Sequence, residues 1–242
     1  MTSNPMFNSR VTENVLTDEK PMSIQGSINK TIVLTLIVAL SGAYTWNLCL
    51  GGFSDKANLL AIFGAVVGLV LAIITSFRPQ NAKILAPVYA ICEGLVVGSI
   101  SYTFNNFYQG IVVNAVSITI LALLTMLFLY KTKVIQATEK FRQVILISTI
   151  AVAIFYLAGF IGALLGHPMT IFNGSLVGIV VSFVICGIAA FNFILDFDFI
   201  ERGATNGLPS YFEWYGAFGL LVTLIWLYIE VLRLLAQLQD RK

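Results

Sequence analysis

Charged residues are scarce in this chain of 242 residues, which has 14 Lys and Arg and 12 Asp and Glu. They make up 11% of the sequence, against about 25% in an ordinary soluble domain. Four stretches hold no charged residue at all, namely 31–54, 57–77, 94–130 and 143–195. Because a helix needs roughly 20 apolar residues to cross a bilayer, these stretches exclude a water-soluble enzyme and indicate a polytopic membrane protein.

Cysteine and histidine are also rare. Cys49, Cys92 and Cys186 lie in apolar stretches without a CxxC spacing, which is typical of buried thiols. His167 is the only histidine, and the sequence has no HExxH, GxSxG, P-loop or GxGxxG motif. A net charge of +2 provides no basic stripe for nucleic acid. We therefore expect no enzyme, no cofactor and no nucleic-acid partner.

Turn signals divide the uncharged stretches into seven apolar segments. Asn105 and Asn106 separate two of them, and Gly166, His167 and Pro168 cut the longest stretch. We expect an all-α bundle of seven transmembrane helices in residues 30–238, after a polar, disordered cytoplasmic tail at 1–29. The predicted spans lie near 31–53, 58–77, 84–104, 110–130, 144–166, 171–198 and 216–236.

Lysine and arginine favour a cytoplasmic N-terminus, because basic residues concentrate on the inner side of a membrane. In that orientation the inner segments carry Arg10, Lys20, Lys30, Arg78, Lys83, Lys131, Lys133, Lys140, Arg142 and Arg202. The outer segments carry Lys56, Arg233, Arg241 and Lys242, so the basic C-terminal tail disagrees with the rest.

Glycine pairs with GxxxG spacing predict close helix–helix contacts. They are Gly64 and Gly68, Gly94 and Gly98, Gly162 and Gly166, and Gly174 and Gly178. Packing within one bundle and dimerisation through one of the pairs both remain open, so the oligomeric state is not predicted.

Carboxylates in the apolar spans are the strongest functional signal, since a charge at membrane depth costs at least about 2.5–3.5 kcal/mol. Glu93 lies near the middle of the third span, Asp196 and Asp198 end the sixth, and Glu230 lies deep in the last. So many acids with few basic partners indicate a site for a cation or for protons. A structural interpretation also stays open, because Asp198 and Arg202, or Glu230 and Arg233, have helical spacing for ion pairs.

Several blocks of sequence resemble the Bax inhibitor-1 family, and in particular its bacterial YccA-like branch. They are Ser-Asn-Pro-Met-Phe-Asn at 3–8, Met-Ser-Ile-Gln-Gly-Ser-Ile-Asn-Lys-Thr at 22–31, Ala-Pro-Val-Tyr-Ala-Ile-Cys-Glu-Gly-Leu at 86–95, Phe-Ile-Leu-Asp-Phe-Asp-Phe-Ile-Glu at 193–201, and the segment 213–235 that begins Glu-Trp-Tyr-Gly-Ala-Phe-Gly. The last two blocks are the most specific, because generic apolar helices would not reproduce their acids and aromatic residues.

The resemblance implies a seven-helix bundle with a central last helix, acting as a pH-sensitive calcium leak channel in a bacterial plasma membrane. It implies that an acid pair on the last two helices senses pH and gates the channel, with a nearby arginine. Those roles fall on Asp196, Glu230 and Arg78, and the two acids would also be the Ca²⁺ contacts. Here the last-helix acid is Glu rather than the usual Asp, and 33 residues separate the pair.

The two acids can meet only if part of residues 208–218 is not transmembrane, since a plain antiparallel hairpin would keep them about 20 Å apart. We expect the pair to share a proton in the closed state and to separate when the proton leaves. Secondary or pathway acids are Glu93, Asp198, Glu201 and Glu213.

Two other functions fit the same residues. The chain could be a membrane partner or regulator of another protein, for example in membrane-protein quality control, with acids that serve only packing. It could also be a proton-coupled transporter of a small solute. In all three cases the expected partners include the lipid bilayer, and calcium or protons are the expected permeant ions.

Overall fold

The computed structural model describes residues 20–167 and 175–241, which contain seven α-helices long and apolar enough to cross a bilayer. They are α2 (Ile24–Leu50), α3 (Ser54–Phe77), α4 (Ala82–Phe107), α5 (Ile111–Lys131), α6 (Glu139–Leu164), α7 (Leu176–Thr205) and α8 (Tyr211–Gln239), with a 3-10 turn, η2 (Pro79–Asn81), before α4. The predicted all-α, seven-span bundle is confirmed.

Several helix ends differ from the predicted spans by up to seven residues, and three of them matter for the site. α2 begins at Ile24, inside the predicted tail, because the Ser23 hydroxyl caps it by accepting a hydrogen bond from Gly26 N at 2.9 Å. α7 runs to Thr205, beyond the predicted end at 198, and α8 begins at Tyr211 rather than near 216. Residues 1–19 of the predicted tail and 171–174 of the predicted sixth span lie outside the described residues.

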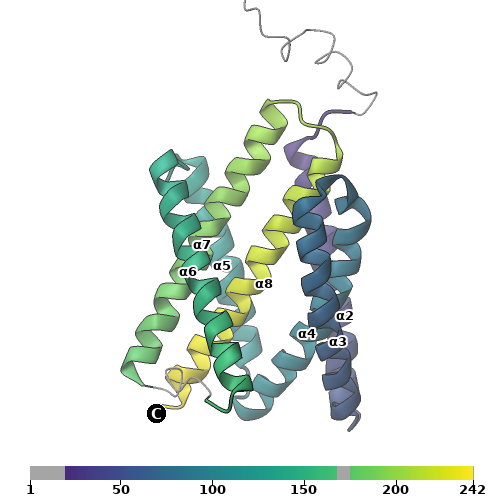
Figure 1. Ribbon diagram of the computed structural model, residues 1–242, viewed down its shortest axis with the longest axis vertical. Coiled ribbons are helices and arrows are strands. Elements are labelled where there is room, and N and C mark those ends of the chain that lie inside the picture. The colour runs from purple at the N-terminus through teal and green to yellow at the C-terminus, as the bar shows by residue number, and fades with distance from the viewer. Residues whose placement is uncertain (1–19, 168–174, 242) are drawn as a thin grey trace, which may run out of the picture.

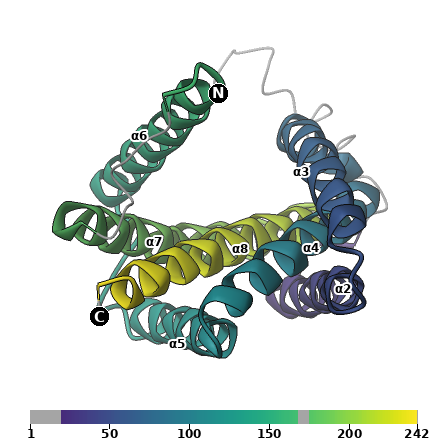
Figure 2. The ribbon, with the colours of Figure 1, turned by 90° about the horizontal axis from the view of Figure 1, so that it is seen from below.

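The last helix is the central one, as the sequence resemblance implied. α8 packs against α2, α4, α5 and α7, and it lies in the middle of the bundle in Figure 2. Two apolar clusters hold it in place. One includes Phe193 of α7 and Leu227 of α8, and the other includes Leu34 of α2 and Leu221 of α8. An edge-to-face contact between Tyr89 of α4 and Phe218, with ring centroids 4.9 Å apart, adds a directional contact.

Glycines bring α2 and α4 into backbone contact. A Cβ on Gly98 would lie 2.1 Å from the carbonyl oxygen of Gly42, and one on Gly94 would lie 2.5 Å from the carbonyl oxygen of Val38. On the other side of α4, a Cβ on Gly64 would lie 2.6 Å from the carbonyl oxygen of Cys92. These GxxxG glycines therefore serve packing within the chain. Gly174 lies outside the described residues.

The helices give the bundle two ends. We call the end at which α2 begins the entry end and the end at which α8 finishes the exit end (Figure 1). α6 packs mainly on α7, and Figure 2 shows α3 and α6 projecting to the same side of α8, well apart from each other. One side of α8 is therefore less enclosed by helices than the other.

Candidate functional site

Polar side chains follow one face of α8 along more than half of its length. Steps of four and three residues place seven positions on this face: Gly219, Thr223, Trp226, Glu230, Arg233, Gln237 and Asp240. Because the α-helix has 3.6 residues per turn, such steps keep side chains on one side of the helix. We call these seven residues the polar face. It extends about 30 Å from the middle of the bundle to the exit end.

Asp196 of α7 lies where the polar face begins. Its carboxyl is within hydrogen-bonding reach of the Thr223 hydroxyl, and its Oδ1 lies 3.5 Å from where a Gly219 side chain would begin. Among the described residues, Asp196 Oδ2 is enclosed and has no hydrogen-bond partner. α7 continues for nine residues beyond Asp196, about 14 Å. The carboxyl therefore lies within the helix, about two and a half turns before its end.

Glu230 occupies the middle of the polar face and is 1% exposed. The hydroxyl of Tyr156, from α6, donates a hydrogen bond to its Oε1 at 2.7 Å, and Trp226 Nε1 donates to the same oxygen at 3.2 Å. The guanidinium of Arg233, one turn along α8, lies 3.1 Å from Oε2 and also donates to the Tyr156 hydroxyl. Glu230 is thus a buried, fully hydrogen-bonded carboxylate with its charge balanced by an arginine.

The expected contact between Asp196 and Glu230 is not formed in the structure. Asp196 lies opposite Gly219 and Thr223, and Glu230 lies seven residues beyond Thr223, about 10 Å further along the axis. The reason is that α8 is already helical from Tyr211, so α7 and α8 form a plain antiparallel hairpin. Arg78 caps the end of α3 at the entry end, is exposed, and has no ion pair with the described acids. The three predicted gate residues therefore lie at three different heights along the long axis of the bundle.

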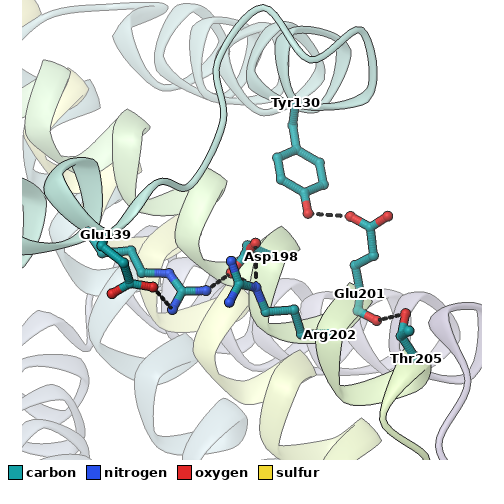
Figure 3. Close-up of polar contacts among 7 residues, drawn as sticks. Tyr130, Glu139, Asp198, Glu201, Arg202 and Thr205 are labelled. Carbon is teal, nitrogen blue, oxygen red and sulfur yellow. Dashed lines mark hydrogen bonds and ion pairs between the residues drawn. The ribbon is translucent and has the colours of Figure 1, made fainter.

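The remaining acids of α7 hold the entry end together, as Figure 3 shows. Asp198 accepts hydrogen bonds from Arg142 of α6 and, at 3.0 Å, from Arg202 Nε one turn along α7. Glu201 accepts one from the Tyr130 hydroxyl of α5. Asp198 and Arg202 thus form the ion pair that their helical spacing allows.

Glu213 fixes the start of α8 against the start of α2. Its Oε1 accepts from Ser23 N at 2.7 Å and from the Ser23 hydroxyl at 2.9 Å, and its Oε2 pairs with Lys30. A Cβ on Gly26 would lie 2.2 Å from Oε1, so only glycine lets the carboxylate approach this closely. The sequence offers no signal for this contact, because Lys30 and Ser23 precede Glu213 by 183 and 190 positions.

Glu93 lies away from the polar face. It projects from α4 toward α3, where a Cβ on Gly68 would lie 3.2 Å from its Oε1, and it is within hydrogen-bonding reach of Tyr89 on its own helix. Its side chain is half-buried between these two helices. The structure therefore does not bring Glu93 together with Asp196 or Glu230.

A cavity of about 310 Å³ lies at the exit end of the polar face. Its lining residues are Thr103, Phe104, Phe107, Tyr108, Arg233, Ala236, Gln237 and Asp240. Gln237 Nε2 donates to the Ser182 hydroxyl of α7 at 3.0 Å, whereas its Oε1 has no partner among the described residues. The Tyr108 hydroxyl donates to Asp240, and this hydrogen bond raises the pKa of the Tyr108 phenol.

Asp196 and four residues of the polar face (Thr223, Glu230, Gln237 and Asp240) carry side-chain oxygens and form a row through half of the bundle. Within residues 20–167 and 175–241, no three His, Cys, Asp or Glu side chains gather as a metal site would require. Among the described residues the row therefore does not provide a cage that would retain a metal.

Comparison with known protein families shows to which family the chain belongs. A sequence model of the family described as Bax inhibitor 1 like matches residues 4–240. The chain belongs to the Bax inhibitor 1-like family. No curated protein and no solved structure matches it significantly. Membership in this family agrees with the seven apolar helices, and together they make the chain an integral membrane protein in contact with the lipid bilayer.

The family match covers every residue of the polar face as well as Asp196. Sequence reasoning found Asp196 and Glu230 as buried acids, but it missed their partners Thr223 and Tyr156. It also missed Gln237, which bonds to Ser182 further along the polar face. The steps of four and three residues along the last helix could have revealed Thr223 and Gln237. Tyr156 lies on another helix and had no such signal.

Proposed function

We propose that this protein is a cation leak channel, with calcium as its principal ion, and that its ions move along the polar face of α8. The observation that carries the proposal is Asp196 at the inner end of that face, whose enclosed Oδ2 has no hydrogen-bond partner among the described residues. An apolar interior does not tolerate such a group without a proton, water or a cation nearby.

Asp196 and Glu230 differ in what balances their charge. Arg233 lies beside Glu230, and Tyr156 and Trp226 donate to it, so Glu230 is held in place as part of a neutral pair. Among the described residues, Asp196 has only a hydroxyl, that of Thr223, within reach. We therefore assign the proton-sensitive role to Asp196 alone, in place of a shared pair. With a proton Asp196 is neutral and the path is closed, and without one it attracts a cation.

The ligand chemistry of the row supports a cation. Beyond Asp196 and Glu230, its groups include the Thr223 hydroxyl, the Gln237 amide oxygen and the exposed Asp240 carboxylate at the exit end. Carboxylate, hydroxyl and carbonyl oxygens are the ligands that Ca²⁺ prefers. Arg233, the one cation among these seven residues, is paired with Glu230.

We also propose that the protein lies in a bacterial plasma membrane with the entry end in the cytoplasm. In the described residues, nine basic side chains belong to segments at the entry end and three to segments at the exit end. The first group is Lys20, Lys30, Arg78, Lys83, Lys131, Lys133, Lys140, Arg142 and Arg202, and the second is Lys56, Arg233 and Arg241. Basic residues near span ends favour the cytoplasmic side.

Purified protein in liposomes should release entrapped calcium, and the release should increase as the pH rises from about 6 to about 8. An entrapped fluorescent calcium indicator measures the rate, with protein-free vesicles of the same lipid as the control. Equal rates with and without protein at every pH would contradict the channel and favour a role as an interaction partner. Release that saturates with one co-transported solute would favour a transporter.

A further inference from the structure

Polar side chains of α6 recur at intervals of seven residues. Arg142, Thr149 and Tyr156 have this spacing, which places them along one face of the helix. Each contacts a different polar group in the α7–α8 hairpin. Arg142 pairs with Asp198, the Thr149 hydroxyl accepts from Asn192 Nδ2 at 2.9 Å, and the Tyr156 hydroxyl donates to Glu230 at 2.7 Å. The three contacts are spread over about 20 Å of α6.

Apolar packing contributes little to the position of α6. Within this helix only Ile145 and Val152 are buried, and both lie on the same face as the three polar residues. By comparison, α8 buries fifteen residues. α6 packs on α7, and Figure 2 shows it standing clear of α3. One aromatic pair, Phe141 of α6 and Phe191 of α7, adds an edge-to-face contact with ring centroids 5.9 Å apart. The position of α6 on the hairpin therefore depends mainly on directional polar contacts.

The polar contacts between α6 and the α7–α8 hairpin allow α6 a second position. Water can replace hydrogen-bond partners, whereas separating an interlocked apolar surface would require the whole interface to repack. The middle contact is also next to the proposed sensor, because Asn192 lies one helical turn before Asp196 on α7. The i, i+4 spacing puts Asn192 and Asp196 on the same side of α7, one turn apart.

We propose that α6 is the gate helix, which moves away from α7 and α8 and thereby opens the polar face of α8 to water and ions. This inference rests on the proposed channel function and specifies how it is regulated. In the closed state Tyr156 covers Glu230 and Thr149 holds Asn192. In the open state these contacts are broken while α2, α4 and α8 stay packed.

Cross-linking tests the gate. In a background without Cys49, Cys92 and Cys186, we would replace Thr149 and Asn192 by cysteine and join them with a short, reducible bifunctional thiol reagent. The leak should fall at least about fivefold and recover on reduction, whereas a monofunctional reagent should not lower it. A matched control joins Asn58 and Ser99, whose side chains form a 2.9 Å hydrogen bond between α3 and α4. That cross-link should leave the leak unchanged. An unchanged leak with Thr149 and Asn192 fully joined would overturn the gate.

A second measurement does not depend on ion flux. Spin labels at Ile154 of α6 and Leu69 of α3, both exposed, report the distance between these helices in lipid nanodiscs. The double substitution Thr149→Val and Tyr156→Phe should add a population with a changed distance. Thr125→Val is the control, because the Thr125 hydroxyl bonds only within its own helix. If the double variant keeps the single distance of the unsubstituted protein, the assignment of α6 as the gate is overturned, whether or not the protein leaks. Movement of α6 without any leak would contradict only the proposed function.

Discussion

Replacing Asp196 by Asn is expected to remove the pH dependence of the calcium leak, so that the rates at about pH 6 and about pH 8 become equal. Asparagine has nearly the same size and can still bond to Thr223, but it cannot gain or lose a proton. Because its side chain is always neutral, we expect the leak to stay at the low level that the wild type has at low pH. The efflux assay in liposomes measures both rates.

Asp55→Asn is the matched control for this substitution. Asp55 lies exposed in the first turn of α3, at the exit end and away from the polar face. Its neutralisation should leave the rise of the leak with pH intact. A normal pH response in Asp196→Asn would assign the sensor to another group, and Glu230 and Glu93 would then be the next acids to test by substitution with Gln.

The Gly98→Ala substitution should have the largest effect on stability. The new Cβ would lie 2.1 Å from the carbonyl oxygen of Gly42 and 2.2 Å from the Thr45 hydroxyl, so the backbones of α2 and α4 must separate. Overpacking of a tight contact costs about 1–3 kcal/mol, and here the neighbour is backbone that cannot rotate away. We expect a loss of unfolding free energy at the upper end of this range, measured by thermal unfolding in detergent.

Gly187→Ala serves as the control for glycine replacement in a helix. Gly187 lies in the interior of α7, and a Cβ there meets nothing within 4 Å. Alanine should keep or raise the stability by about 0.5–1 kcal/mol, because it restricts the unfolded chain. Equal losses for the two alanine variants would show that the α2–α4 contact is looser than described.

The local signals in the sequence predicted the fold well. Uncharged runs and turn residues gave seven spans, and the GxxxG spacing of Gly94 and Gly98 identified a close helix contact. Both signals are local, since hydrophobic length and the absence of a side chain act within one segment. Helix ends were predicted less well. Asp198 and its two arginines support α7 beyond the predicted end at residue 198.

The site was only partly predictable, because its contacts join distant segments. Asp196 and Glu230 stand out as acids in apolar runs, but their separation depends on where α8 begins. Residues 211–215 fall in the stretch that had to lie partly outside the membrane for the two acids to meet, whereas Glu213 holds them at the start of the helix by binding Ser23 and Lys30. Tyr156 is another example, because a tyrosine in an apolar span gives no indication of the helix that it will contact.

Thiol accessibility along α8 tests most directly whether the polar face carries the ions. Cysteine would be placed at Thr223 on the polar face, and at Leu221 and Ile225 on the buried opposite side, in a background without native cysteines. A small cationic thiol reagent applied during the efflux assay should react at position 223 and block the leak. It should react at neither 221 nor 225. A leak that continues with position 223 unmodified, or equal modification at all three positions, would contradict an ion path along this face.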